Sequence, residues 1–209
     1  MKKQIYDPIH GFIEFTSLQV KIIDTSEFQR LRDLKQLGAT YYVFPGATHT
    51  RFEHSLGVCH LAMVTMKSLA KNQPELKITE RDIEITGVAG LIHDLGHGPF
   101  SHLYDTYVKN PKEPEHEIRG CEIFKTMVSK YELPLSHHEI NRIQKMIIPI
   151  EKDNWRYQIV ANALNQIDVD KIDYIQRDCH HIGFPCGGEF SRILTQCRVI
   201  DDTLCFPKK

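Results

Sequence analysis

The densest chemistry in this sequence lies at an adjacent histidine and aspartate, His93 and Asp94, which follow an apolar stretch. His97 and His102 come shortly after this pair. A carboxylate at the end of a buried helix needs a compensating charge, because an unpaired buried charge is costly. A divalent metal is the simplest partner, and mixed imidazole and carboxylate ligands suit Fe, Mn, Zn or Co better than an all-oxygen Mg site.

Two ligands from one segment leave a metal undercoordinated, so other ligands must come from elsewhere. His54 is one candidate, and one of the acids Asp168, Asp170 and Asp173 is another. A lone histidine is usually a hydrogen-bonded structural residue. A histidine, then a His-Asp pair, then a distant aspartate is an ordered set, which favours a metal site over that structural interpretation.

This order of ligands resembles that of the HD phosphohydrolase superfamily. More closely, seven stretches look like the catalytic domain of the sterile-alpha-motif and HD-domain deoxynucleoside triphosphate triphosphohydrolases. They are residues 7–11, 28–32, 36–38, 44–47, 51–57, 93–102 and 167–171. Because they follow in the same order over about residues 3 to 200, a chance match is very improbable.

The resemblance implies a role for each matching position. The sets are metal ligands His54, His93, Asp94 and Asp170; catalytic residues His97, His102, Asp105 and His116; substrate-binding residues Gln36, Leu37, Arg51, His97, His116, Lys171, Tyr174 and Asp178; and a guanine-nucleotide activator site at Lys3, Gln4, Asp24, Gln29 and Arg32. In the implied reaction, water attacks the α-phosphorus of a dNTP such as dGTP and releases deoxynucleoside and triphosphate. His102 protonates the departing 5′-oxygen, and Asp105 orients His102.

The implied cofactor is a divalent transition metal, Fe, Mn or Zn, accompanied in some states by Mg, with GTP or dGTP as activator. Two other functions stay open. The chain could be a broader HD phosphohydrolase acting on nucleoside monophosphates or other phosphate esters, or a non-catalytic sensor of nucleotide or single-stranded nucleic acid. A net charge of −1 gives the nucleic-acid reading little electrostatic support. The activator residues have a second interpretation as the solvated face of an amphipathic helix.

The elements that must position these residues are predicted to be mainly helical. Helices are expected over residues 18–38 (one helix, or two broken near 24–26), 51–71, 79–95, a short stretch from 101, 115–130, 137–147, 155–164 and 168–178. Residues 41–44 are predicted to be extended, and residues 198–200 and 203–206 to pair as a weak hairpin. The expected fold is a mainly α HD-domain bundle with a small β-hairpin near the C-terminus. We expect one domain over residues 1–209, with 183–209 as a loosely packed extension.

Composition agrees with this fold class. The chain has 209 residues, of which 41% are hydrophobic and 25% charged, as in a globular domain of ordinary size. No apolar run approaches the roughly 20 residues that span a bilayer, and the start lacks a secretory apolar region. Six cysteines without a CxxC pair indicate reduced thiols. We therefore expect a cytoplasmic or nuclear protein that does not contact membranes. Because the family's regulated members are longer at both ends, this chain is expected to be a minimal version or a fragment, and the resemblance implies a homo-oligomer.

Overall fold

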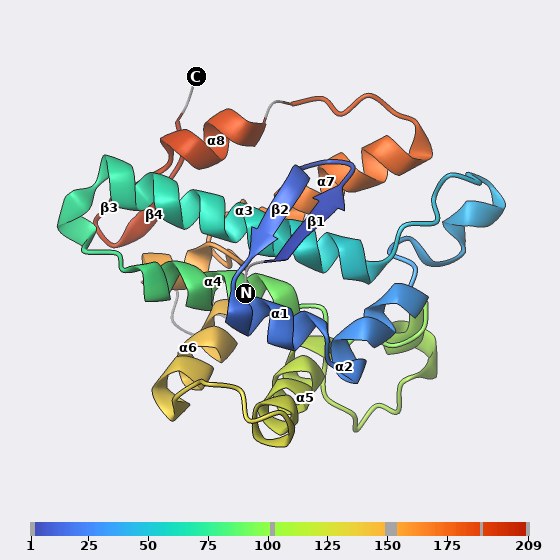
Figure 1. Ribbon diagram of the computed structural model, residues 1–209. Helices are drawn as coiled ribbons and strands as arrows, with labels where there is room; N and C mark the ends of the chain where they lie inside the picture. The colour runs from blue at the N-terminus through green and yellow to red at the C-terminus, as the bar shows by residue number, and fades with distance from the viewer. Residues whose placement is uncertain (1–2, 101–102, 149–153, 189, 208–209) are drawn as a thin grey trace.

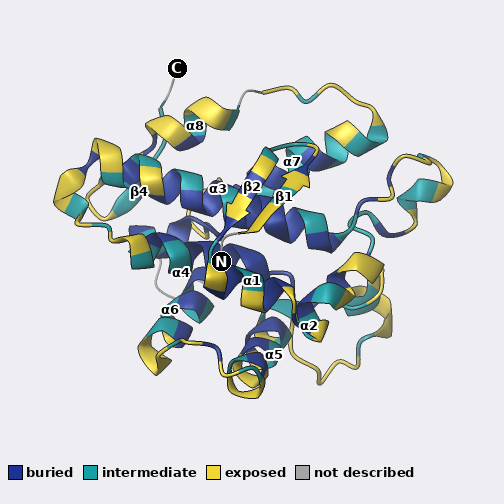
Figure 2. Ribbon diagram, viewed as in Figure 1, coloured by how far each residue is buried: buried dark blue, intermediate teal, exposed yellow. Residues whose placement is uncertain are grey.

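Two helices, α3 (Arg51–Asn72) and α4 (Glu80–Ile92), lie side by side at the centre of the fold (Figure 1). The structure is a computed structural model that describes residues 3–100, 103–148, 154–188 and 190–207. Figure 2 shows buried residues concentrated along this central pair and exposed residues on the elements around it. The central pair therefore forms the framework on which these helices pack: α1 (Ser17–Ile23), α5 (His116–Lys130), α6 (His137–Ile147), α7 (Val169–Ile182) and α8 (Phe190–Gln196).

The sequence explains why α4 starts where it does and why it is central. Thr79 and Asp82 form a capping box, in which each side chain accepts a hydrogen bond from the backbone N–H of the other. Every residue from 85 to 97 is buried. At Gly90 the two helices approach so closely that a Cβ atom would lie 2.9 Å from the Cys59 nitrogen. A glycine at this position therefore sets the spacing between α3 and α4.

The remaining elements surround this pair. They are β1 (Lys3–Asp7), β2 (Gly11–Phe15), α1 (Ser17–Ile23), α2 (Ser26–Gln29), α5 (His116–Lys130), α6 (His137–Ile147), α7 (Val169–Ile182), α8 (Phe190–Gln196), β3 (Arg198–Ile200) and β4 (Thr203–Cys205), with short 3-10 helices at Arg30–Asp33, Gly38–Tyr42, Pro74–Leu76 and Trp155–Gln158 and a π-helical turn at Tyr104–Val108. β1 pairs antiparallel with β2, and β3 pairs antiparallel with β4. Within the described ranges, no helix combines the length and the apolar character needed to cross a membrane.

Much of the predicted secondary structure is confirmed. The helices expected over 51–71, 79–95, 115–130, 137–147 and 168–178 are present, as is the C-terminal hairpin. The break expected near residues 24–26 is also present, because Asp24 ends α1 and the Thr25 side chain caps α2. Ser101 and His102, the start of another expected helix, lie outside the described residues. The fold is mainly helical, as the sequence predicts.

Three local predictions are wrong. The helical segment expected to run on to residue 38 ends at Asp33, because Leu34 is extended and Lys35 forms an antiparallel bridge with Thr50. Residues 41–44 are not an extended strand, because Gly38–Tyr42 forms a 3-10 helix and the exposed Tyr42 and Val43 have no described neighbouring strand to pair with. The helix expected over 155–164 stops at Gln158. Beyond it, the Asn162 side chain accepts hydrogen bonds from the backbone of Leu164 and Asn165. Such side-chain bonds to the local backbone compete with a helix.

The N-terminal hairpin β1–β2 and helix α8 were not predicted. Along β2, exposed and buried residues alternate, as expected for a strand with one face on the core, and Ile13 and Phe15 are the buried residues. Near the other end, residues 183–188 are exposed or half-buried, whereas Leu194 of α8 and Leu204 of β4 are buried in the main core. The domain boundaries and the loose packing of residues 183–209 stay predictions.

Candidate functional site

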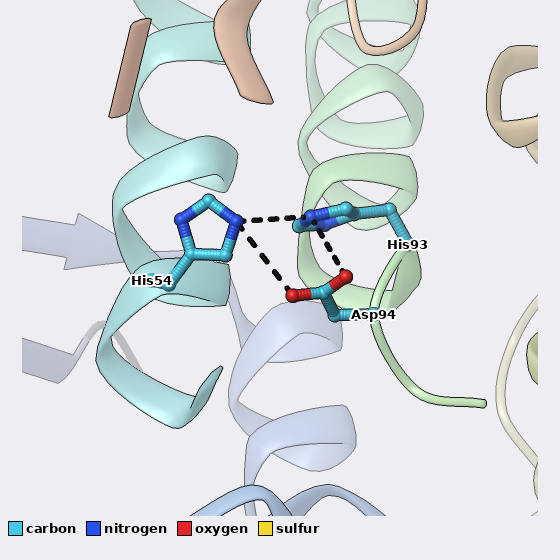
Figure 3. Close-up of side chains that lie close together, drawn as sticks. All are labelled: His54, His93 and Asp94. Atoms are coloured by element: carbon cyan, nitrogen blue, oxygen red, sulfur yellow. Dashed lines mark hydrogen bonds and ion pairs between the residues drawn. The ribbon is translucent and has the colours of Figure 1, made fainter. Parts of the chain in front are cut away.

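Three elements bring the four predicted metal ligands together. His54 comes from the first turns of α3, His93 and Asp94 from the end of α4, and Asp170 from the first turn of α7. The His54 Nε2 atom lies 3.2 Å from His93 Nε2 and 2.9 Å from Asp170 Oδ1. Figure 3 shows the His54 and His93 rings and the Asp94 carboxylate directed at one another. The site is therefore assembled from segments that are far apart in the sequence.

The hydrogen bonds on the far side of each ring define which nitrogen faces the centre. His54 Nδ1 lies 2.7 Å from Asp173 Oδ2, and His93 Nδ1 lies 2.7 Å from the Gly90 carbonyl oxygen. Both partners are acceptors, so each Nδ1 carries the proton and donates it. Two Nε2 lone pairs then face each other across 3.2 Å. This arrangement needs a positive charge between the rings, either a proton or a metal ion.

The spacing of the donor atoms fits a metal ion. The distances from Asp94 are 3.5 Å to His93 Nε2 and 3.6 Å to His54 Nε2, and His93 Nε2 lies 3.4 Å from Asp170 Oδ1. Ligand atoms at 2.0–2.2 Å from one ion, at tetrahedral or octahedral angles, lie roughly 2.8–3.6 Å apart. Two imidazole nitrogens with carboxylate oxygens favour a transition metal over Mg. The residues present therefore fit the implied metal.

The charges at the centre are strongly coupled. Burial lowers the pKa of His54, but hydrogen bonds to Asp170 and Asp173 outweigh it and raise the pKa to about 10. Burial raises the pKa of Asp94, but the charges of Arg51 and the neighbouring histidines bring it well below its ordinary value. Arg51 Nη1 donates a hydrogen bond to Asp94 Oδ2. The centre thus holds ionised carboxylates and, without a metal, a protonated imidazole.

A second group lies beside the first. The His97 and His116 rings are stacked with their centroids 3.8 Å apart, and His97 Nε2 lies 3.2 Å from Asp94 Oδ1. Asp105 Oδ2 lies 3.2 Å from His116 Nδ1, and Asp105 Oδ1 accepts a hydrogen bond of 2.6 Å from Arg119. Burial is the largest contribution to the lowered pKa of His97, about 4. His97 is therefore neutral near pH 7 and can donate or accept a hydrogen bond.

One cavity contains both groups. Its described lining residues are Gln36, Arg51, His54, His93, Asp94, His97, His116, Glu117, Ile147, Val160, Ala161, Asp170 and Tyr174. Predicted metal, phosphate and sugar residues therefore share one recess. Leu37, Lys171 and Asp178 are not among these described lining residues.

The structure places the other predicted residues as follows. Lys171 Nζ lies 3.5 Å from Gln166 Oε1, and Asp178 Oδ1 lies 2.6 Å from His49 Nε2. His102, the predicted general acid, lies outside the described residues, so its relation to Asp105 stays a prediction.

The predicted activator residues form two local pairs. Lys3 contacts Asp24 through a 3.1 Å ion pair, and Arg32 donates a 2.8 Å hydrogen bond to Gln29. Gln4 instead donates to Glu14 on the neighbouring strand. Their role as an activator site stays a prediction.

Sequence reasoning missed the supporting groups behind His54. Asp173 is one of the three acids considered as ligands, but it contacts the outer nitrogen of His54 and not the nitrogen that faces His93. Its helical spacing relative to Asp170 and Arg177, three and four residues along α7, was the available signal. The apolar wall made by Ile147, Val160 and Ala161 carries no comparable signal.

Comparison with known proteins adds to this geometry. Residues 51–178 match the family described as HD domain. The chain is 44% identical over 229 residues to Deoxynucleoside triphosphate triphosphohydrolase SAMHD1 of Mus musculus, covering 96% of this chain and 35% of that protein. It is 42% identical over 214 residues to Deoxynucleoside triphosphate triphosphohydrolase SAMHD1 homolog of Dictyostelium discoideum, covering 99% of this chain and 42% of that protein. It is also 42% identical over 224 residues to Putative HD domain-containing protein L394 of Acanthamoeba polyphaga mimivirus, covering 96% of this chain and 48% of that protein. The chain thus spans less than half the length of these relatives.

Proposed function

Since the chain belongs to the HD domain family, we propose that it is a metal-dependent deoxynucleoside triphosphate triphosphohydrolase. The observation that carries the proposal is one cavity that holds both the four convergent ligands and a neighbouring group of phosphate-binding type. The names of the similar proteins from Mus musculus and Dictyostelium discoideum supply the substrate class. In this reaction water attacks the α-phosphorus, the bond from that phosphorus to the 5′-oxygen breaks, and deoxynucleoside and triphosphate leave.

His54, His93, Asp94 and Asp170 would hold the metal. A bound divalent metal supplies Lewis acidity, which lowers the pKa of water and stabilises charge on phosphoryl oxygens. The donor set favours Fe, Mn or Zn, and Mg could accompany the triphosphate. The ordered rings of His54 and His93 keep their Nε2 atoms directed at this position without rearrangement.

The residues beside the metal position would bind the triphosphate. His97 and His116 offer ring nitrogens at the cavity wall, and Arg51 adds a buried positive charge. His97 is neutral near pH 7 and carries one ring N–H, which would donate either to Asp94 or to a phosphate oxygen. Asp105, anchored by Arg119, lies beside His116, with Oδ2 3.2 Å from the His116 Nδ1 atom. Tyr174 and Gln36 line the same cavity and would contact the nucleoside.

The proposal extends to features that concern the whole protein. His102 is assigned as the general acid for the 5′-oxygen, supported by its match to the family motif. Lys3, Gln4, Asp24, Gln29 and Arg32 are assigned to a GTP or dGTP activator site, and a homo-oligomer in the cytoplasm or nucleus is the expected working form.

Product identity tests the proposal. Purified protein is incubated with Mn²⁺ or Fe²⁺ and with each dNTP and NTP, with and without GTP, and the products are separated by chromatography. Deoxynucleoside and triphosphate from dGTP are expected. Monophosphate or pyrophosphate would instead support a broader phosphohydrolase, and nucleotide binding without turnover would support a sensor.

Two variants separate the metal ligands from the acid. His93→Ala combined with Asp94→Ala should remove bound metal, as measured by elemental analysis. His102→Ala should keep the metal and lose turnover. Unchanged metal content in the first variant would refute the ligand assignment.

A further inference from the structure

The two nitrogens of His54 face opposite environments. Nε2 points to the proposed metal position, whereas Nδ1 lies 2.7 Å from Asp173 Oδ2. The ring is buried, so its orientation and its tautomer depend on these contacts. A carboxylate that accepts the outer N–H of a ligand histidine fixes the ring and raises its basicity toward a metal.

Asp173 is itself held from several directions. Oδ2 also accepts a 2.8 Å hydrogen bond from Arg177 Nε, and Oδ1 accepts a 3.0 Å bond from Arg177 Nη2. His10 Nε2 lies 2.6 Å from Oδ1. The carboxylate and the guanidinium are both fully buried. Because Arg177 compensates its charge, Asp173 can stay ionised in the interior.

The N-terminal hairpin completes this support. Arg177 Nη1 donates a 2.7 Å hydrogen bond to Asp7 Oδ2, at the end of β1. The other Asp7 oxygen accepts hydrogen bonds of 2.9 Å from the backbone N–H groups of Ile9 and His10. The turn between β1 and β2 therefore positions both the His10 ring and one partner of Arg177.

Helix α3 leaves a space for the carboxylate. A Cβ atom at Gly57, three residues after His54, would lie 1.9 Å from Asp173 Oδ1 and 2.4 Å from Arg177 Nη2. The absence of a side chain at this position is what lets Asp173 reach Nδ1 of His54. Three separate elements, α3, α7 and the hairpin turn, thus converge on one carboxylate.

We propose that Asp173 is a positioning residue for His54, held in place by Arg177 and Asp7, and that it fixes the ring with the proton on Nδ1 and with Nε2 directed at the metal position. The inference rests on the proposed metal site. A purely structural ion network would affect stability alone. A positioning role also affects metal affinity and the tautomer of His54.

Metal affinity is measured with Zn²⁺ alone by competition with a chromophoric chelator. Asp173→Asn removes the charged acceptor, and Gly57→Ala displaces it without changing any charge. Both should weaken Zn²⁺ binding by about 10–100-fold. The matched control is Asp82→Asn, which removes a 2.6 Å ion pair with Arg142 at the opposite end of α4 and should lower Tm while leaving Zn²⁺ affinity unchanged.

The tautomer gives a readout that needs no variant of Asp173. Long-range ¹H–¹⁵N NMR of the Zn²⁺-loaded wild-type protein should show His54 protonated at Nδ1, with His54→Gln used to assign the signal. If Asp173→Asn or Gly57→Ala does not fold, the Nδ1–H proton signal of the same sample tests the hydrogen bond to Asp173, because a proton donated to a carboxylate resonates downfield of one that is not.

The outcomes separate two failures. Folded Asp173→Asn and Gly57→Ala variants with wild-type Zn²⁺ affinity would overturn the positioning role while the metal site stands. Protonation of His54 at Nε2 in the Zn²⁺-loaded protein would overturn the positioning role and also remove His54 from the ligand set. A wild-type protein that binds no metal would refute the proposed function, and this inference with it.

Discussion

Replacing Gly90 by alanine should destabilise the protein by separating its two central helices. The added Cβ would lie 2.9 Å from the Cys59 nitrogen and 3.0 Å from Cys59 Cα and the Val58 carbonyl carbon. All three are backbone atoms of α3, so no side chain can rotate away. Restoring ordinary contact distance requires a shift of about 0.5 Å between α3 and α4, and overpacking of this kind costs about 1–3 kcal/mol.

An opposing contribution must be subtracted. Alanine is favoured over glycine in a helix interior by about 0.5–1 kcal/mol, so the middle of the two ranges leaves a net loss of about 1 kcal/mol. For a domain of this size that corresponds to a Tm decrease of about 2–4 °C. Gly187→Ala is the control, because no atom lies within 4 Å of its Cβ position. Thermal unfolding followed by circular dichroism measures both variants, and a Tm of Gly90→Ala equal to or above that of wild type would refute the reasoning.

Three further predictions address protonation and packing. The pKa of His54 is raised to about 10. Protonation of His54 therefore stabilises the metal-free protein fully below pH 6.5, and this stabilisation is lost as pH rises through about 10. Zn²⁺ binding near pH 7 should therefore release a proton. Calorimetry in buffers of different ionisation enthalpy measures this release, and a binding enthalpy that does not depend on the buffer would contradict it. Burial, with a smaller effect from the charge of His10, lowers the pKa of His60 to about 4, so stability should fall as pH decreases from 6.5 toward 4. Thermal unfolding of His60→Gln should show a shallower decrease over this range, and an unchanged slope would exclude His60 as a cause. Leu204→Ala should lower the free energy of unfolding by about 2–5 kcal/mol in chemical denaturation, because Leu204 is buried. Ile200 is exposed, so Ile200→Ala should change it by less than about 0.5 kcal/mol. Equal small effects of the two substitutions would show that the C-terminal hairpin is loosely packed.

The central helices were predictable because their sequence signals are local. The capping box at Thr79 and the apolar run that follows define α4 without reference to the rest of the chain. The convergence of His54, His93, Asp94 and Asp170 was also foreseeable, since their order in the sequence carries the resemblance. These features depend on residue type and spacing, which the sequence states directly.

Other features depend on the rotation of one element against another. Spacing places Asp170 and Asp173 on one side of α7, but only the packing of α7 against α3 determines which carboxylate meets which nitrogen of His54. The same holds at Asn162, whose side chain competes with helix formation by bonding the backbone of Leu164 and of Ile167 in the loop that follows. The apolar cavity wall at Val160 follows from that loop and had no motif to reveal it.

The buried ion pair between Asp7 and Arg177 joins residues 170 positions apart, and this separation has a consequence for folding order. Closing so long a loop costs conformational entropy before any contact compensates it. During synthesis, Asp7 and His54 leave the ribosome long before α7 does, so neither has its partners on α7 for most of that time. Competence to hold a metal in the native geometry is therefore gained late, when α7 docks, and not gradually as the helices form.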